Sequence, residues 1–390
     1  MAYVFRRDNK GEPAYTGMYE GPDGRARSAG TFPSKRAAQR AAHREEQLVE
    51  EGRWRDRALG ATTFATYVEE TWFPSKHLEL STRQGYRSNL DRHFLPYFGR
   101  WSMAKILPSV VQGWVTKAAA EGLSPTSVRK YHTMLHSIFE RAVRDQLIVT
   151  NPCAHTELPK IIKRRSRTLT PDEFGRLLSA VPQRHVLLVL TAIETGTRWG
   201  ELIALRPRHF DFLRRTVTIE ETIVEVSKRS SPSGERMIVK PYPKDNEPRT
   251  FGVRPGWLDD VAEHIRAHGI GRDELLFSTE AGTPISRNTF RTRVWLPAVQ
   301  ASGVDFGVRV HDLRHAHASW LLAGGADLKG VMERMGHAQI QTTQKYLHTL
   351  PETDQKNLDA LSRIAGQVAS RGRPMDQPND GAVMLAPSFG

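Results

Sequence analysis

His311-Asp312-Leu313-Arg314 is the stretch of this sequence that decides the fold, and Gly336-His337 and Tyr346 follow it within a span of 36 residues. Together they supply two imidazoles, a guanidinium and a phenol. A phenol can attack a phosphodiester when fixed cations and hydrogen-bond donors surround the phosphorus as negative charge develops. The segment therefore predicts a site for nucleophilic chemistry at a phosphodiester.

A second stretch, Thr195-Gly-Thr-Arg198-Trp-Gly-Glu201-Leu202, follows an apolar helix predicted from 186 to 193. Taken alone, Arg198 could equally cap that helix or pair with Glu201. An arginine fork can also bind both non-bridging oxygens of a phosphate. Glu201 lies three residues further on, so it shares a helical face with Arg198 and is expected to orient the site.

The histidines of the first stretch allow a competing hypothesis, a metal site. His311, His315, His317 and His337 have a credible spacing for zinc ligands. However, no acidic or cysteine ligand accompanies them, and Arg314 would repel a cation. The sequence therefore predicts neither a metal nor a cofactor.

The charge of the chain indicates a polyanionic partner. The formal net charge is +13 and the isoelectric point is about 9.9, although a merely soluble basic protein could share these values. Five of the eight residues from 160 to 167 are cationic, and they lie in the middle of the chain. This favours a linker that follows DNA phosphates. The candidate DNA-binding residues are Lys160, Lys163, Arg164, Arg165 and Arg167.

Length and composition limit the other classes. A chain of 390 residues is too long for one compact core. The hydrophobic fraction is 39%, and we see neither a signal peptide nor a membrane span. The single cysteine, Cys153, excludes an internal disulfide framework and suits the reducing cytoplasm in which we expect the protein to act.

Turn and capping signals predict five regions. Residues 1–55 have three short strand candidates, within 3–6, 14–19 and 27–32, and then a helix capped by Ser34. Residues 60–158 have four helical segments, whose aromatic residues we expect in a core. A basic linker follows at 159–169. Thr170 and Glu173 form a capping box that opens the region 170–365, where 216–226, 237–240 and 249–253 can form one small sheet. Residues 366–390 are predicted to be disordered.

The quoted stretches resemble the motifs of the tyrosine recombinase (phage integrase) family, and the resemblance covers nearly the whole chain. It is closest over 170–350. It implies a multidomain, mainly α fold with small β-sheets. The parts would be an N-terminal three-stranded sheet plus helix that binds arm-type DNA, a helical SAM-like core-binding domain and a mixed α+β catalytic domain.

The resemblance also implies roles for individual residues. Tyr346 would be the nucleophile, and Arg198 and Arg314 would hold the scissile phosphate. His311 would donate a hydrogen bond or carry a proton, and both His311 and His337 would stabilise the charge on the phosphorane.

The family's catalytic lysine matches Lys244, which would protonate the leaving 5′-oxygen. Asp245 and Pro248 depart from the usual residues around it, so Lys240 remains a rival.

The function implied is that of a lambda-type integrase of a phage or mobile element. It would cut and rejoin double-stranded attachment sites through a 3′-phosphotyrosyl intermediate, as a homotetramer, with a host DNA-bending protein and a directionality factor and without a membrane. Two alternatives stay open: a type IB topoisomerase-like enzyme and a catalytically inactive DNA-binding regulator. The attachment sequence cannot be deduced from the chain.

Overall fold

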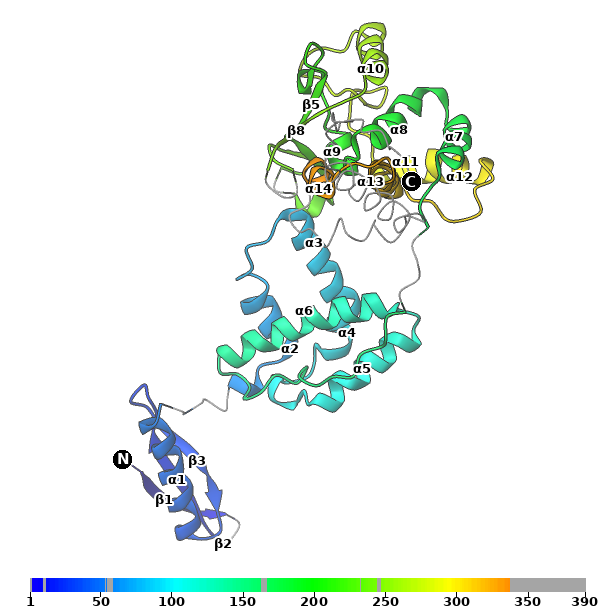
Figure 1. Cartoon of the computed structure of the whole chain (residues 1–390). Helices are drawn as coiled ribbons and strands as arrows, with labels where there is room; N and C mark the ends of the chain where they lie inside the picture. The colour runs from blue at the N-terminus through cyan, green and yellow to red at the C-terminus, as the bar shows by residue number, and fades with distance from the viewer. Residues whose placement is uncertain are drawn as a thin grey trace, which may run out of the picture. The chain divides into compact units, whose positions relative to one another are not determined.

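The computed structural model describes residues 2–9, 12–52, 54, 59–162, 167–231, 233–243 and 247–336 (Figure 1). The chain divides into two units, Met1–Lys163 and Arg164–Gly390. Both are mainly helical, and the described residues form one small antiparallel sheet in the first unit and two in the second. The predicted fold class is therefore confirmed.

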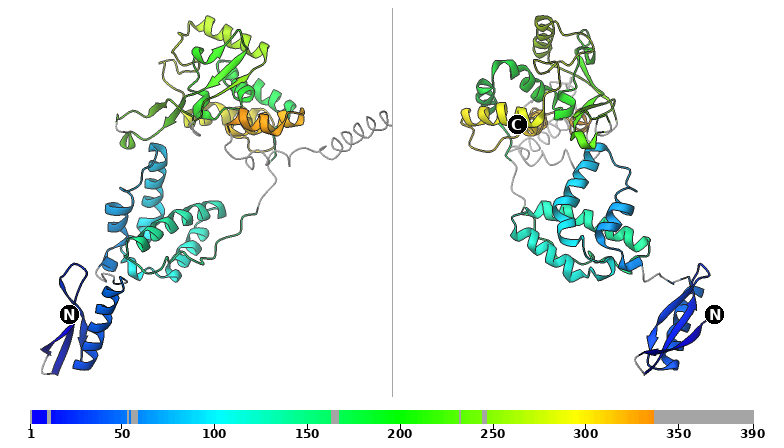
Figure 2. Two further views of the ribbon diagram at one scale, coloured as in Figure 1. Left: turned by 60° about the vertical axis from the view of Figure 1, so that its left-hand side comes forward. Right: turned by 180° about the vertical axis from the view of Figure 1, so that it is seen from behind.

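The first unit begins with a three-stranded antiparallel sheet in the order β1-β2-β3. Its strands are β1 (Tyr3–Asn9), β2 (Glu12–Glu20) and β3 (Ala26–Phe32), and helix α1 (Lys35–Glu50) follows them. Ser34 caps α1 as expected, since its Oγ accepts a hydrogen bond of 3.2 Å from the amide of Ala37. Figure 2 shows α1 lying along one face of the sheet.

Gly17 allows α1 to approach this sheet closely. A Cβ atom at position 17 would lie 2.3 Å from the carbonyl oxygen of Ala38. Ala38 and Ala42 are fully buried at the same contact. The N-terminal sheet thus packs on its helix through small residues rather than through a large apolar core.

The remainder of the first unit is helical. Its elements are η1 (Leu59–Ala61), α2 (Phe64–Tyr67), η2 (Val68–Trp72), α3 (Leu80–Asn89), η3 (Leu90–Phe94), α4 (Leu95–Phe98), η4 (Met103–Lys105), α5 (Pro108–Ala120) and α6 (Pro125–Arg144). Proline occupies the first position of α5 and α6, where its missing N–H costs no hydrogen bond. The aromatic residues pack inward as expected, with Phe64, Trp72 and Phe94 all fully buried.

The second unit contains the stretches from which the sequence analysis began. Its helices are α7 (Pro171–Ala180), α8 (Gln183–Thr195), α9 (Trp199–Leu202), η5 (Pro207–His209), η6 (Lys228–Ser230), α10 (Pro255–His268), α11 (Arg287–Phe290), η7 (Arg291–Trp295), α12 (Leu296–Ala301), α13 (Val310–Ala323) and α14 (Leu328–Met335). Its strands are β4 (Phe210–Asp211), β5 (Thr216–Ile219), β6 (Thr222–Glu225), β7 (Met237–Lys240) and β8 (Arg249–Gly252).

These strands form two sheets, so the expectation of a single sheet was wrong. The three-stranded sheet has the order β4-β5-β8, and β6 pairs with β7 alone. The strand expected over 216–226 is interrupted at Glu220 and Glu221. Glu221 forms ion pairs with Arg206, at 3.1 Å, and with Arg208, at the point where the chain passes from the first sheet to the second. Local alternation could not reveal these distant partners.

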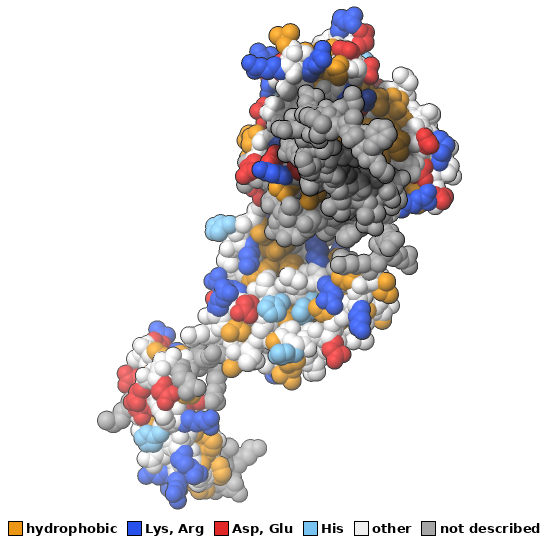
Figure 3. Space-filling view, viewed as in Figure 1, with side chains coloured by type: hydrophobic (Ala, Val, Ile, Leu, Met, Phe, Trp, Pro, Cys, Tyr) orange, Lys and Arg blue, Asp and Glu red, His pale blue; other side chains and the backbone are white. Residues whose placement is uncertain are grey.

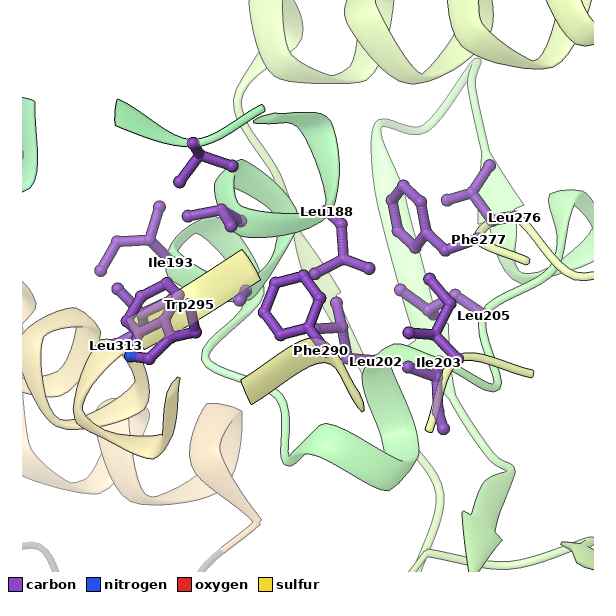
Figure 4. Packing of buried hydrophobic residues seen from close by; sticks show 14 of the residues in the cluster. Leu188, Ile193, Leu202, Ile203, Leu205, Leu276, Phe277, Phe290, Trp295 and Leu313 are labelled. Carbon is purple, nitrogen blue, oxygen red and sulfur yellow. The ribbon is translucent and has the colours of Figure 1, made fainter. Parts of the chain in front are cut away.

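One apolar core connects the helices that surround the site (Figure 4). Ile193 comes from α8, Leu202 from α9 and Leu313 from α13, and all are buried. Leu188, Leu202 and Phe290 lie side by side in the middle of the cluster. The site residues described next therefore project from elements whose opposite faces share a dense interior.

None of the helices in the described part of the chain combines the length and apolar character that a transmembrane span needs.

Candidate active site

Arg198 follows a sharp end to helix α8. Gly196 ends the helix in the left-handed conformation, with φ of 61°. A Cβ atom at this position would lie 2.5 Å from Cδ2 of His317 and 3.1 Å from the sulfur of Met335. Glycine is therefore required both by the backbone angle and by the space. The turn delivers Arg198 to the start of α9 in an extended conformation.

Glu201 joins Arg198 to a second arginine, Arg249. Oε1 of Glu201 accepts a hydrogen bond of 2.9 Å from Nη1 of Arg198, and Oε2 accepts one from Nη2 of Arg249. Oε2 also accepts a 3.1 Å bond from the backbone amide of Arg198. Burial alone would raise the pKa of this carboxyl, but the charges of Arg249 and Arg198 outweigh it and the pKa is lowered. Glu201 is thus a buried carboxylate shared by two guanidinium groups.

The C-terminal turn of α14 is, after Glu201, the second place in the site where arginine side chains converge. Arg249 donates from Nε to the carbonyl of Arg334 at 3.0 Å, Arg314 donates from Nη2 to that of Met335, and Arg198 donates from Nη2 to that of Gly336 at 3.3 Å. The last carbonyls of a helix have no partner within the helix and carry partial negative charge. Three guanidinium groups thus satisfy three successive carbonyls.

Helix α14 has sequence signals at both ends. Oδ2 of Asp327 accepts a bond of 2.7 Å from the amide of Gly330, and Gly336 ends the helix in the left-handed conformation with φ of 62°. A Cβ atom at position 336 would lie 3.2 Å from Nη1 of Arg249. The glycine that ends this helix therefore also leaves room for the guanidinium of Arg249.

Arg314 is almost completely buried on α13, with 2% of its surface exposed. Besides the Met335 carbonyl it binds the carbonyl of Gly196, to which Nη1 donates at 2.6 Å. It therefore connects the turn before Arg198 with the end of α14.

His311 lies in the first turn of the same helix and is exposed. Its ring meets that of His315 edge to face, at 4.8 Å between centroids. Neighbouring protein atoms partly desolvate the imidazole, and His315 and Arg314 oppose a further positive charge. These effects lower the pKa of His311 to about 4. The ring is therefore neutral at pH 7, with one N–H to donate.

His317 faces the interior and has a fixed protonation state. Its Nε2 can only accept from Nε of Arg334, at 3.1 Å, so Nδ1 carries the proton and donates to the carbonyl of Ile193 at 2.6 Å. Burial, followed by the charge of Arg334, lowers the pKa of His317 to about 3. Both nitrogens of this ring are therefore already engaged.

No group of three His, Cys, Asp or Glu side chains among the described residues could hold a metal ion. Of the four histidines weighed as metal ligands, His337 lies outside these residues.

The structure thus brings Arg198, Glu201 and Arg314 together around the end of α14 and places His311 one helical turn before Arg314. His337, Tyr346 and Lys244 lie outside the described residues. The rival lysine, Lys240, ends β7, with its Nζ 5.7 Å from the centre of the Tyr242 ring.

The basic linker is described only at its two ends. Lys160 is exposed, whereas Lys163, Arg164 and Arg165 lie outside the described residues. Arg167 pairs with Glu173 at 2.5 Å and with Asp305 at 2.6 Å. On the face in Figure 3, lysine and arginine side chains are interspersed with acidic ones.

Sequence reasoning assigned no role in the site to Arg334, or to Arg249, which ends the stretch around Lys244 that resembles the family's lysine motif. Arg334 donates from Nη1 to the carbonyl of Gly252 at 2.7 Å and from Nη2 to that of Glu194 at 3.0 Å, and its guanidinium lies over the ring of Phe251. One signal was present: Arg334 lies three residues after Val331, on the buried side of an amphipathic helix. A cation at such a position indicates buried partners.

Two family models match the chain. The model described as the phage integrase family matches residues 167–353, and that of the N-terminal SAM-like domain of phage integrases matches residues 63–119.

The relatives by sequence include a putative prophage phiRv2 integrase of Mycobacterium tuberculosis. It is 28% identical over 372 residues, which cover 92% of this chain and 95% of that protein. The integrase of Mycobacterium phage L5 is 26% identical, over 86% of this chain and 90% of that protein.

Similar solved structures include the Tn1549 transposon integrase in complex with transposon right end DNA. It has a TM-score of 0.66 at 17% identity and covers 78% of this chain and 100% of that one. A lambda integrase tetramer bound to a Holliday junction has a TM-score of 0.57 at 19% identity, over 97% of both chains. At these identities the two structures establish a shared fold.

Proposed function

Because the chain belongs to the phage integrase family of tyrosine recombinases, we propose that it is a site-specific recombinase that cuts and rejoins DNA to integrate or excise a phage or other mobile element. The relatives named integrases and recombinases do not favour a topoisomerase-like enzyme or an inactive regulator.

The proposed reaction is a pair of transesterifications. The phenolic oxygen of Tyr346 attacks the scissile phosphorus, forms a 3′-phosphotyrosyl bond and releases a 5′-hydroxyl, which takes up one proton. The 5′-hydroxyl of a partner strand then attacks the phosphotyrosine, transfers the strand and restores the phenol. Each step exchanges one phosphoester for another, so neither ATP nor a metal is needed to balance it.

The observation that carries this proposal is the convergence on the last turn of α14. Arg198, 138 residues away in sequence, binds the carbonyl of Gly336, and Arg314 from α13 binds that of Met335. His337 is the next residue in the chain. The motifs that contain Arg198, Arg314 and Gly336-His337, which resemble those of the family, are therefore connected through the end of this one helix.

In this proposal the two arginines and two histidines stabilise charge on the pentavalent phosphorus. Neutral His311 would serve as a hydrogen-bond donor rather than as a cation, in keeping with its lowered pKa. Lys244 would be the general acid for the leaving 5′-oxygen, with Lys240 as the alternative.

We further propose that DNA is held by the linker residues and by the N-terminal sheet with α1. The protein would act as a homotetramer on synapsed attachment sites, together with a host DNA-bending protein and a directionality factor. It would bind its DNA in the bacterial cytoplasm, at the nucleoid. The lambda integrase tetramer on a Holliday junction supports the oligomeric state by analogy.

Covalent capture tests this function. Wild-type protein and Tyr346→Phe would be incubated with DNA that spans the gene and its flanks, quenched with detergent, and the protein-linked DNA sequenced. We expect adducts with wild type alone, focused on one short inverted repeat, and nearly equal DNA binding by both proteins.

Other outcomes would contradict parts of the proposal. An adduct with Tyr346→Phe would exclude this nucleophile. Scattered adducts, with relaxation of a supercoiled plasmid that lacks an attachment site, would instead support a topoisomerase-like enzyme. Intact binding of the flanking DNA without any adduct would favour a regulator.

A further inference from the structure

The buried arginine Arg249 occupies a position between two parts of the site. Its Nη2 donates to Oε2 of Glu201, and its Nε donates to the carbonyl of Arg334 at 3.0 Å. Arg198 has a matching pair of bonds, to Oε1 of Glu201 and to the carbonyl of Gly336. The contacts form a closed circuit through one carboxylate, two guanidinium groups and the last turn of α14.

A second contact fixes Arg249 against the same turn. Its guanidinium lies so close to Gly336 that a Cβ atom there would be 3.2 Å from Nη1 and 3.4 Å from Cζ. Only 9% of the Arg249 side chain is exposed, against 22% for Arg198. Arg249 therefore supports the more exposed Arg198, and its Nε and Nη2 donate to protein oxygens.

Arg334 connects the same two elements, β8 and α14, in the opposite direction. While Arg249 of β8 reaches a carbonyl of α14, Arg334 of α14 reaches the carbonyl of Gly252 in β8 at 2.7 Å. Burial lowers the pKa of Arg334 to about 10, a value at which the guanidinium is still charged at pH 7. The two arginines thus tie β8 to the end of α14 in both directions.

From this geometry we infer that Arg249 is a positioning residue of the recombination reaction. It holds the Glu201 carboxylate and the last turn of α14 so that Arg198 is presented to the scissile phosphate in one orientation. The inference rests on the proposed function and assigns to this site a residue that does not itself touch the DNA. Misplacement of a reacting or binding group by about 1 Å can slow a reaction about 100-fold.

The test compares Arg249→Gln and Arg249→Lys with Arg254→Gln. Arg254 offers a matched control, because it also pairs with a carboxylate but is 74% exposed, and that carboxylate is Glu194 rather than Glu201. The substrate is a duplex that carries the captured core site, nicked so that the cleaved fragment diffuses away. The readouts are the first-order rate of adduct formation at saturating protein, the protein concentration for half-saturation, and the thermal midpoint.

We expect Arg249→Gln to form the adduct about 100-fold more slowly than wild type, with half-saturation shifted no more than in Arg254→Gln. Arg249→Lys keeps the charge but cannot reproduce the two-pronged geometry of a guanidinium. It should therefore form the adduct at least about tenfold more slowly than wild type. If Arg249→Gln does not fold, Arg249→Lys carries the test. A wild-type rate in a folded Arg249 variant, or the same loss of rate in Arg254→Gln, would overturn the inference.

A double-mutant cycle separates positioning from a general loss of structure. Since Arg249 acts through Glu201, Arg249→Gln should slow a Glu201→Gln protein at least about tenfold less than it slows wild type. Losses that multiply independently would contradict the inference. Failure of wild type to form any adduct would instead reject the proposed function, so the two failures are distinguishable.

Discussion

Gly196 packs directly against the ring of His317, although 121 positions separate the two residues in the chain. A Cβ atom on the glycine would lie 2.5 Å from Cδ2 of the imidazole. The contact brings the end of α8, which leads to Arg198, against the middle of α13, which carries Arg314. The turn before one proposed phosphate-binding arginine is thus shaped by the helix that carries the other.

Gly196→Ala should therefore destabilise the second unit. A left-handed conformation costs a non-glycine residue about 1–2 kcal/mol, and the overlap with His317 adds to this. We expect the thermal midpoint to fall by several degrees, at about 2–4 °C for each kcal/mol in a domain of this size. Gly175→Ala is the matched control. It lies within α7 with open space around its Cα, and should raise stability by roughly 0.5–1 kcal/mol. A midpoint for Gly196→Ala equal to wild type would refute the packing argument.

His317 should make stability depend on acidic pH. Its pKa of about 3 in the folded protein is below the ordinary value of 6.5, so the unfolded chain binds more protons between these values. The stability contributed by neutral His317 is complete above about pH 6.5 and is lost as the pH falls toward 3. His317→Gln should be less stable than wild type at pH 7.5, and its thermal midpoint should fall less steeply from pH 6.5 to 4. Parallel curves for the two proteins would show that another group is responsible.

The capping box at the start of α7 should contribute to the stability of the second unit. Oγ1 of Thr170 accepts a bond of 3.2 Å from the amide of Glu173, and Oε2 of Glu173 accepts one of 2.9 Å from the amide of Thr170. Thr170→Ala should cost about 1 kcal/mol in urea unfolding, whereas Thr170→Ser keeps the acceptor and should cost little. Equal losses in both variants would indicate that the methyl group, and not the cap, matters.

The two described ends of the linker should differ in their effect on DNA binding. Each phosphate contact contributes about 0.9 to the slope of log affinity against log salt. Lys160→Gln should reduce that slope by about 0.9, since the lysine is exposed. Arg167→Gln should reduce it less, because Glu173 and Asp305 already hold this guanidinium. Fluorescence anisotropy on one duplex at several salt concentrations decides the matter. A full reduction from Arg167→Gln would place that side chain on DNA in spite of its pairs.

The parts of the fold that could be predicted from the sequence depend on neighbours along the chain. Ser34 and Thr170 begin helices through contacts within a few residues, and both were identified in advance. Aromatic residues at helical spacing, such as Phe94, were placed in the core for the same reason.

The parts that could not be predicted depend on partners far away in sequence. Arg314 binds a carbonyl 118 residues before it, and Arg249 binds one 85 residues after it. Backbone carbonyls have no residue-type signature, so the sequence does not show which carbonyls these arginines bind. For the same reason the break between β5 and β6, where Glu221 meets Arg206, was not anticipated.

The binding of arginine side chains to the last turn of α14 has a thermodynamic consequence for DNA binding. A free arginine side chain carries about 2 kcal/mol of rotamer entropy, part of which is lost when it is immobilised on a ligand. Arg198 and Arg314 are already held by protein oxygens, so much of this ordering takes place when the chain folds. A phosphate that arrives beside them would therefore meet side chains with little freedom left to lose.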